Sequence, residues 1–188
     1  VDVAEPRRLT KGGKELDFRN VFEAHLTSAE WAVVDAVGPV PDEQCEVFTR
    51  YWSAKEAFVK ARGDGLVFAI GKAEIQWQPL AGFPVGSAYE GSLALEGQAK
   101  PMWRFVQHRM PGEKPYWVTV GRGPLTDIVD SRGEFVKTMR RCQDAFTDEE
   151  WQAALRAESP PFDVLPVAAL VPPDAAAGYA EACSEPGL

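Results

Sequence analysis

The fold of this chain is decided by fifteen residues, Trp52 to Leu66, which read WSAKEAFVKARGDGL. Apolar side chains at 48, 51, 52, 58 and 59 recur with the period of a helix that has one buried side. Glu56 and Lys60 are four residues apart and therefore share a face of that helix. Gly63 is placed to end it in a left-handed conformation. We therefore predict the end of an amphipathic helix that carries Glu56 and Lys60 on one face.

A Glu–Lys pair with this spacing is common on helix surfaces, where it contributes only about 0.2–0.5 kcal/mol, and by itself it indicates no site. The whole pattern is more specific, because Trp-x-x-Lys-Glu-Ala-x-x-Lys-x-x-Gly-x-Gly-Leu fixes eight positions. It resembles the signature of the 4'-phosphopantetheinyl transferases, the enzymes that load carrier proteins with their prosthetic arm. Trp52 and Leu66 resemble the larger, pseudo-dimeric class of that family, whereas the small trimeric synthases have Ala-Ala-Lys-Glu-Ala followed by Gly-Thr-Gly-Ile.

Length, charge and cysteine content narrow the class of protein. A chain of 188 residues suits one domain with a core of its own. The net charge of −8 argues against a nucleic-acid partner, and no apolar run is long enough for a membrane span. Three widely spaced cysteines favour a reducing compartment, so we expect a cytoplasmic protein of the cytosol. The chain begins with Val1, and we expect it to start inside a longer reading frame.

Helical patterns come first along the chain and strand patterns follow. A period appears from Arg19, and Thr27 with Glu30 forms a capping box before the next helix. A third helix is expected to start at 42 or 43 and to run into the motif. After Leu66, short alternating segments separated by turns predict strands at 67–70, 73–77, 92–95, 103–107 and 116–120. The fold class is therefore α+β, with helices packed on a small antiparallel sheet, which the resemblance implies to be one half of the pseudo-dimeric fold.

Three segments are expected. Residues 1–124 carry the resemblance, which corresponds to the C-terminal half of the pseudo-dimeric enzymes. Residues 125–158 read as a helical extension, with an amphipathic helix at 132–146 and another after a capping box at Thr147. Residues 159–188 are rich in Pro and Ala and are expected to form a poorly ordered tail.

The resemblance implies Mg²⁺-dependent transfer of 4'-phosphopantetheine from coenzyme A to a serine of an apo acyl or peptidyl carrier protein. Val1-Asp2-Val3 resembles the family's strand with a metal-binding aspartate, so Asp2 and Glu56 are the implied metal ligands. Glu56 would also be the catalytic base, directly or through a water. Lys60 would be catalytic through contact with the phosphates of coenzyme A. Lys55, on another face, would contact the nucleotide or be solvated.

Departures from the family pattern bear on the class. Bacterial members of the large class often have an acid two residues after the aspartate, where this chain has Ala4. Animal-type members tolerate this, and Leu26-Thr27-x-x-Glu30-Trp31 also resembles the aminoadipate-semialdehyde-dehydrogenase type of eukaryotes. Glu5 is typical of the small trimeric class, but that class has a His-Val-Ser-x-Ser-His stretch that this sequence lacks, so it ranks last.

One alternative of a different kind stays open. The Ser-His motif and the basic residues with which the N-terminal half of the pseudo-dimeric enzymes holds coenzyme A have no counterpart here. The chain could therefore be a non-catalytic half-domain that binds a carrier protein or has a purely structural role. Retention of Asp2, Glu56 and Lys60 favours catalysis, because a remnant has no need of all three.

Overall fold

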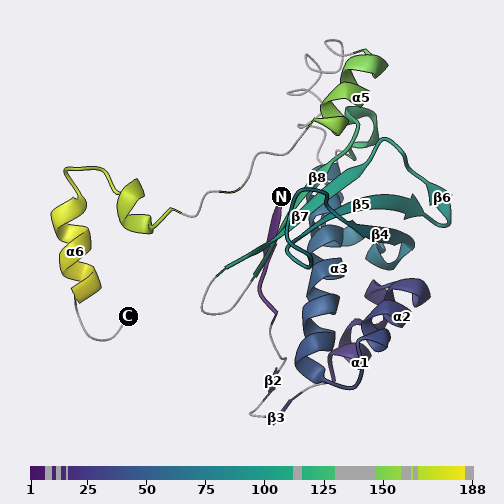
Figure 1. Cartoon of the computed structure of the whole chain (residues 1–188), viewed down its shortest axis with the longest axis horizontal. Helices are drawn as coiled ribbons and strands as arrows, with labels where there is room; N and C mark the ends of the chain where they lie inside the picture. Colours follow the sequence, from purple (N-terminus) through teal and green to yellow (C-terminus); the bar gives the residue numbers. More distant parts are fainter. Residues whose placement is uncertain are drawn as a thin grey trace. The chain divides into compact units, whose positions relative to one another are not determined.

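A long helix packed on an antiparallel sheet dominates the computed structural model of the chain (Figure 1). The structure describes residues 1–6, 10–11, 14–15, 17–111, 116–129, 147–157, 162 and 165–184. Among these, six strands form one sheet in the order β1-β8-β7-β5-β4, with β6 pairing with β5. The α+β class predicted from the sequence is confirmed.

The strands of this sheet are antiparallel to their neighbours. They are β1 (Asp2–Ala4), β4 (Ala73–Pro79), β5 (Ala88–Leu95), β6 (Gln98–Ala99), β7 (Arg104–Met110) and β8 (Tyr116–Arg122). A separate two-stranded ribbon pairs β2 (Thr10–Lys11) with β3 (Lys14–Glu15). The pairing of β1 with β8 matters most for the site, because it places Asp2 opposite Thr119.

The motif lies at the end of helix α3 (Pro41–Arg62), as predicted. Gly63 has a φ of 84° and donates its backbone N–H to the carbonyl of Val59 at 2.9 Å, which is the left-handed helix end expected of a glycine. Helix α1 (Phe18–Phe22), the 3₁₀ turn η1 (Glu23–His25) and helix α2 (Ser28–Ala36) precede it. Helix α2 starts with the predicted capping box, in which Thr27 and Glu30 bond to each other's backbone N–H groups.

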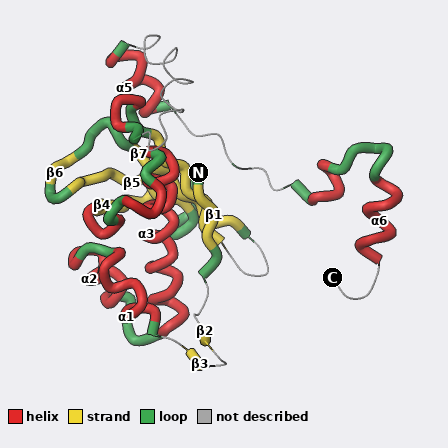
Figure 2. Tube along the Cα trace, turned by 180° about the vertical axis from the view of Figure 1, so that it is seen from behind, coloured by secondary structure: helices red, strands yellow, loops and turns green. Residues whose placement is uncertain are grey.

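The core lies between α3 and one face of the sheet (Figure 2). Phe58 of α3 and Phe105 of β7 are fully buried, with ring centroids 6.4 Å apart. Trp52 packs against Phe22 at 5.0 Å, so this motif tryptophan belongs to the packing, as expected. Two 3₁₀ turns, η2 (Gly65–Val67) and η3 (Ile70–Lys72), lead from the helix back into the sheet, so the predicted strand at 67–70 is wrong and the first strand after the helix is β4.

After the last strand come the 3₁₀ turn η4 (Leu125–Asp127) and helix α5 (Asp148–Arg156). Helix α5 has the predicted capping box at Thr147, while the predicted helix at 132–146 lies outside the described residues. Arg104 donates to the carbonyls of Leu155 and Ala157, and Arg122 donates to those of Ala154 and Ala157. The two guanidinium groups thus hold the negative end of the α5 dipole.

Residues 158–188 form a second unit, separate from residues 1–157. Its described part contains η5 (Val167–Leu170) and α6 (Ala176–Ser184), helical turns that the composition did not predict. The high helix propensity of alanine accounts for α6. Within the described residues, every helix is too short or too polar to cross a lipid bilayer.

Candidate functional site

Asp2 enters the site from the edge strand β1. Its cross-strand partner Thr119 hydrogen-bonds Ser53 of α3, with 2.8 Å between the two hydroxyl oxygens. Residues directly opposite each other in an antiparallel pair point to the same face of the sheet, so Asp2 also faces α3. Only 7% of Asp2 is exposed, although it lies at the edge of the sheet. A buried carboxylate has to be compensated by a cation or by hydrogen bonds.

Lys60 provides that compensation. Its ammonium nitrogen is 2.5 Å from Oδ1 of Asp2, which joins the last turn of α3 to β1. The lysine side chain is 53% exposed, whereas the aspartate side chain is only 8% exposed. A flexible, half-exposed ammonium group has donors to spare for a second anion.

Glu56 lies one helical turn before Lys60 and is partly buried. Residues four apart lie on the same side of a helix, so Glu56 is on the flank of α3 that Lys60 and Asp2 share. The structure therefore gathers three of the four predicted site residues, Asp2, Glu56 and Lys60, on one flank of α3.

This flank fits a magnesium ion. Among the described residues, no three His, Cys, Asp or Glu side chains come together in a metal-binding group. Mg²⁺ is commonly bound by one or two carboxylates, with water and substrate phosphates as its other ligands, and Asp2 with Glu56 is a set of this kind. The ammonium of Lys60 already places a positive charge against the Asp2 carboxylate. The carboxylate is thus directed at a place that accepts a cation.

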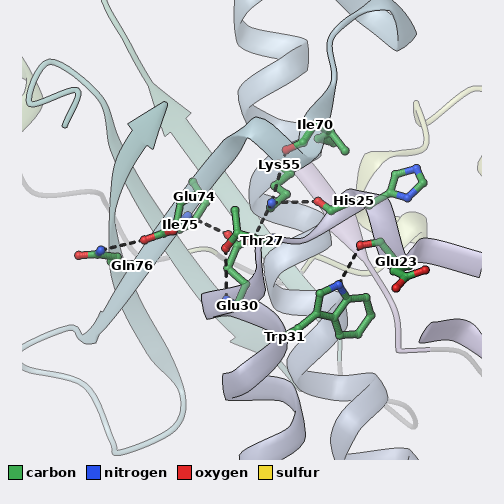
Figure 3. Close-up of polar contacts among 10 residues, drawn as sticks. All are labelled: Glu23, His25, Thr27, Glu30, Trp31, Lys55, Ile70, Glu74, Ile75 and Gln76. Atoms are coloured by element: carbon green, nitrogen blue, oxygen red, sulfur yellow. Dashed lines mark hydrogen bonds and ion pairs between the residues drawn. The ribbon is translucent and has the colours of Figure 1, made fainter. Parts of the chain in front are cut away.

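The fourth predicted residue, Lys55, is not part of this group. It is fully buried, so the prediction that it is solvated is wrong. Its ammonium nitrogen lies 2.6 Å from Oε2 of Glu30, 2.9 Å from the carbonyl oxygen of His25 and 3.4 Å from that of Ile70 (Figure 3). These three acceptors match its three donors. The prediction that Lys55 contacts the nucleotide does not fit, because the ammonium has neither an exposed surface nor a spare donor.

Burial also affects the pKa of Lys55. Removal of the ammonium from water lowers the pKa of Lys55, and the charge and hydrogen bond of Glu30 oppose that change.

Glu30 is the important residue that sequence reasoning did not place. For its side chain, the capping-box signal predicted only the bond that the backbone N–H of Thr27 donates to Oε2, which is 2.8 Å long. The second oxygen, Oε1, accepts a bond from the backbone N–H of Ile75 in β4 at 2.8 Å. A capping pattern describes its own helix end, so nothing local could reveal the contacts with Lys55 and β4.

A separate concavity lies elsewhere. It has a volume of about 610 Å³ and is lined by β4, β5, β7 and α5, including Gln76, Glu90, Arg104 and Gln152. Gly121 lies against Phe105 and α3, so its neighbour Arg122, which pairs with Arg104, points to the other face of the sheet. This concavity therefore lies away from Asp2, Glu56 and Lys60, and we place the candidate site by its chemistry rather than by the size of a cavity.

Comparisons with known proteins identify the family of the chain, while the placement of the site rests on the geometry above. Residues 1–120 match the family model described as the 4'-phosphopantetheinyl transferase superfamily. The L-aminoadipate-semialdehyde dehydrogenase-phosphopantetheinyl transferases of rat and human are each 31% identical to the chain over 97 residues. That match covers 50% of this chain but only 30% of each relative, so the chain spans less than a third of the relatives it matches. The resemblance to the eukaryotic aminoadipate-semialdehyde type is confirmed.

Proposed function

Because this chain belongs to the 4'-phosphopantetheinyl transferase superfamily, we propose that it transfers 4'-phosphopantetheine from coenzyme A to a serine of an apo carrier protein or carrier domain, which is holo-acyl-carrier-protein synthase activity. One observation carries the proposal. The contact between Lys60 and Asp2 brings the acidic edge strand against the motif helix, one turn from Glu56. A surface Glu–Lys pair would not require a buried aspartate from a distant strand.

The reaction joins the serine oxygen to a phosphorus of the coenzyme A pyrophosphate. The bond from that phosphorus to the bridging oxygen breaks, and the nucleotide half leaves with its own phosphate. The serine proton passes to Glu56, directly or through a water. A bound Mg²⁺, held by Asp2 and Glu56, would supply neutralisation of the pyrophosphate charge. Lys60 stabilises the negative charge that builds up on the phosphate oxygens.

The same contact explains why Lys60 suits this task. Its side chain is half-exposed and can turn from Asp2 towards a phosphate without crossing the core. Asp2, in contrast, is held by the β1–β8 pairing and stays in place. The strand thus supplies a fixed carboxylate, while the helix supplies a movable cation.

Transfer of a fluorescent coenzyme A analogue to an apo carrier protein, with and without magnesium, tests the proposal. The chain is assayed alone and also joined to the upstream half of an animal relative, because it spans less than a third of such relatives. Magnesium-dependent transfer in either form supports the proposal. Absence of transfer in both forms contradicts the proposal and favours the non-catalytic half-domain.

Glu56→Gln is the decisive variant, since it keeps the shape of the side chain and removes both the base and the metal-binding charge. We expect transfer to fall by at least about a hundredfold, the lower end of the usual contribution of a general base. Glu46→Gln is the matched control, because Glu46 is on the same helix but pairs with Arg109 at 2.7 Å. Near-wild-type turnover of Glu56→Gln would remove Glu56 from the mechanism.

A further inference from the structure

The ion pair between Glu30 and Lys55 joins several segments of the chain inside the fold (Figure 3). Lys55 of α3 reaches the carbonyls of His25 in η1 and Ile70 in η3. Glu30 of α2 reaches the backbone of β4 through the N–H of Ile75. The pair therefore holds α3 to four other elements.

The approach of η3 to η1 is specifically permitted by a glycine. A Cβ atom at Gly71 would collide with the backbone carbonyl oxygen of Ala24. Because residue 71 has no side chain, the two turns come close enough for the carbonyls of His25 and Ile70 to reach one ammonium group. Two of the acceptors for Lys55 are thus backbone carbonyls whose positions depend on the close contact at Gly71.

The Glu30–Lys55 pair is one anchor of α3, and a second anchor holds another side of the helix. The Ser53 hydroxyl bonds the Thr119 hydroxyl of β8 at 2.8 Å, and Gln107 donates to the same Thr119 oxygen at 2.7 Å. At about 100° of rotation per residue, Lys55 lies roughly 160° around the helix from Ser53. Glu56 and Lys60 lie on the Ser53 side, because the same spacing places them about 60° and 20° from it. The two anchors therefore hold nearly opposite sides of α3.

Anchors on opposite sides determine how far the helix can rotate about its axis. A side chain about 6 Å from that axis moves by about 2 Å when the helix turns by 20°. A misplacement of about 1 Å in a catalytic group can reduce rates about a hundredfold. The direction of Glu56, which directly follows Lys55 in the chain, is therefore sensitive to the hold on Lys55.

We infer that Glu30 and Lys55 are positioning residues for the transfer reaction: their buried ion pair sets the rotation of α3 so that Glu56 and Lys60 face Asp2. This role rests on the proposed function, because it concerns the geometry of the same site. It gives the two adjacent residues of the Lys-Glu motif different tasks. Lys55 orients the helix from within, and Glu56 acts at the surface.

Two variants and one control test the role. Glu30→Gln/Lys55→Met removes both charges at nearly constant volume, and replacement of a complete buried pair is tolerated far better than removal of one partner. Glu30→Gln is milder, because the amide oxygen can still accept from Lys55. Thr49→Val is the control: Thr49 is buried in the same helix, but its hydroxyl bonds the carbonyl of Cys45 within α3.

Mn²⁺ affinity, kcat and KM are measured together with the melting temperature. In the folded double variant we expect Mn²⁺ affinity and kcat to fall about tenfold while KM for coenzyme A stays within about twofold, since only the catalytic flank is displaced. Glu30→Gln should show the same pattern at about threefold, and it carries the test if the double variant does not fold. Thr49→Val should lower the melting temperature without changing affinity or kcat.

The positioning role is overturned if the double variant keeps the Mn²⁺ affinity and the kcat of the wild type. If the double variant does not fold, the same result in Glu30→Gln overturns it. In either case the proposed function is unaffected. Failure of the wild-type chain to bind Mn²⁺ would count against the metal assignment instead. In that case the positioning role is tested by a metal-free crystal structure of the double variant, or of Glu30→Gln if the double variant does not fold. A turned α3, with the contact between Lys60 and Asp2 lost, supports it, and an unchanged contact overturns it.

Discussion

Two lysines five residues apart on α3 pair with carboxylates in opposite ways. The Lys55 side chain is 0% exposed and that of its partner Glu30 is 2% exposed. Lys60 is 53% exposed, and its partner Asp2 is 8% exposed. The two pairs have similar N–O separations, 2.6 Å and 2.5 Å. Contact distance therefore says little about what a pair does, and the surroundings decide it.

The buried pair, Lys55 with Glu30, has a structural role. A charge that has lost its water has to keep its partner, so neither Lys55 nor Glu30 can leave without a large cost. The half-exposed pair can exchange partners, because water screens and replaces the contact. A residue that has to meet a substrate belongs to the second kind. Each prediction below tests this contrast.

The largest effect is expected from Lys55→Met, which leaves the Glu30 carboxylate buried without its cation. Loss of one partner of a buried pair destabilises a protein by about 3–5 kcal/mol. Urea unfolding of the variant and of the wild type gives the difference directly. A loss below about 1 kcal/mol would mean that water reaches Glu30 and that the two pairs are energetically alike.

The next effect concerns Tyr51, a buried neighbour of this pair on α3. Burial, followed by the charge of Glu30, raises the pKa of Tyr51 from 10.0 to about 12. The folded state therefore keeps its proton between pH 10 and 12, while the unfolded state loses it, so stability falls as the pH rises through this window. Two pKa units correspond to about 2–3 kcal/mol at pH 12.

Denaturant unfolding of wild type and Tyr51→Phe from pH 8 to pH 12 measures this contribution. The variant has no phenol to ionise, so its stability should fall less steeply above pH 10. Parallel curves would show that Tyr51 ionises as freely in the folded chain as in the unfolded one, and that this flank is less dry than its exposure indicates.

A smaller change is expected from Asp2→Asn, which keeps the shape of the side chain and removes one metal-binding charge. We expect the magnesium concentration for half-maximal transfer to rise by about tenfold, since even changes in the outer shell of a metal site typically cost about 10–100-fold in metal affinity. Asp127→Asn is a suitable comparison, because Asp127 accepts a bond from Trp103 at 2.7 Å and belongs to another part of the fold. An unchanged magnesium titration of Asp2→Asn would refute the assignment of Asp2 as a ligand.

The smallest change in stability is expected from Lys60→Met. The Lys60 side of the pair is open to solvent, so water can replace the lysine as hydrogen-bond donor to the Asp2 carboxylate. Loss of such a pair costs about 0.2–1 kcal/mol, and the melting temperature should shift by a few degrees at most. Lys72→Met is the matched control, since Lys72 forms an exposed pair with Glu96 at 2.7 Å. A loss from Lys60→Met as large as that from Lys55→Met would erase the difference between the two pairs.

Local signals in the sequence predicted the local structure well. The end of α3 at Gly63 and the capping boxes at Thr27 and Thr147 are confirmed. Each depends on residues within a few positions of one another, so a short stretch contains all the information. The α+β order follows for the same reason, because helical and strand periods differ within a few residues. The family signature likewise occupies only fifteen residues.

Contacts between distant residues were not predictable in this way. Helical spacing showed that Lys55 lies on a different side of α3 from Glu56, but it could not show which element covers that side. Its partner Glu30 is 25 positions earlier and was already explained by its capping role, so no unexplained signal remained to indicate a second contact. The contact between Asp2 and Lys60 likewise depends on the pairing of β1 with β8, whose paired residues Asp2 and Thr119 are 117 positions apart.

The sequence by itself determined the family, the order of the elements and the residues on which the proposed chemistry depends, two acids and a lysine. Only the tertiary structure decided which lysine is buried and which is half-exposed. Position 55 turns towards η1, η3 and α2, where its side chain is fully buried, and position 60 turns towards the edge strand and solvent. The physical reason is that the free energy of a charged group depends on its burial and on the groups near it. Around α3, both are set by segments far from it in the chain.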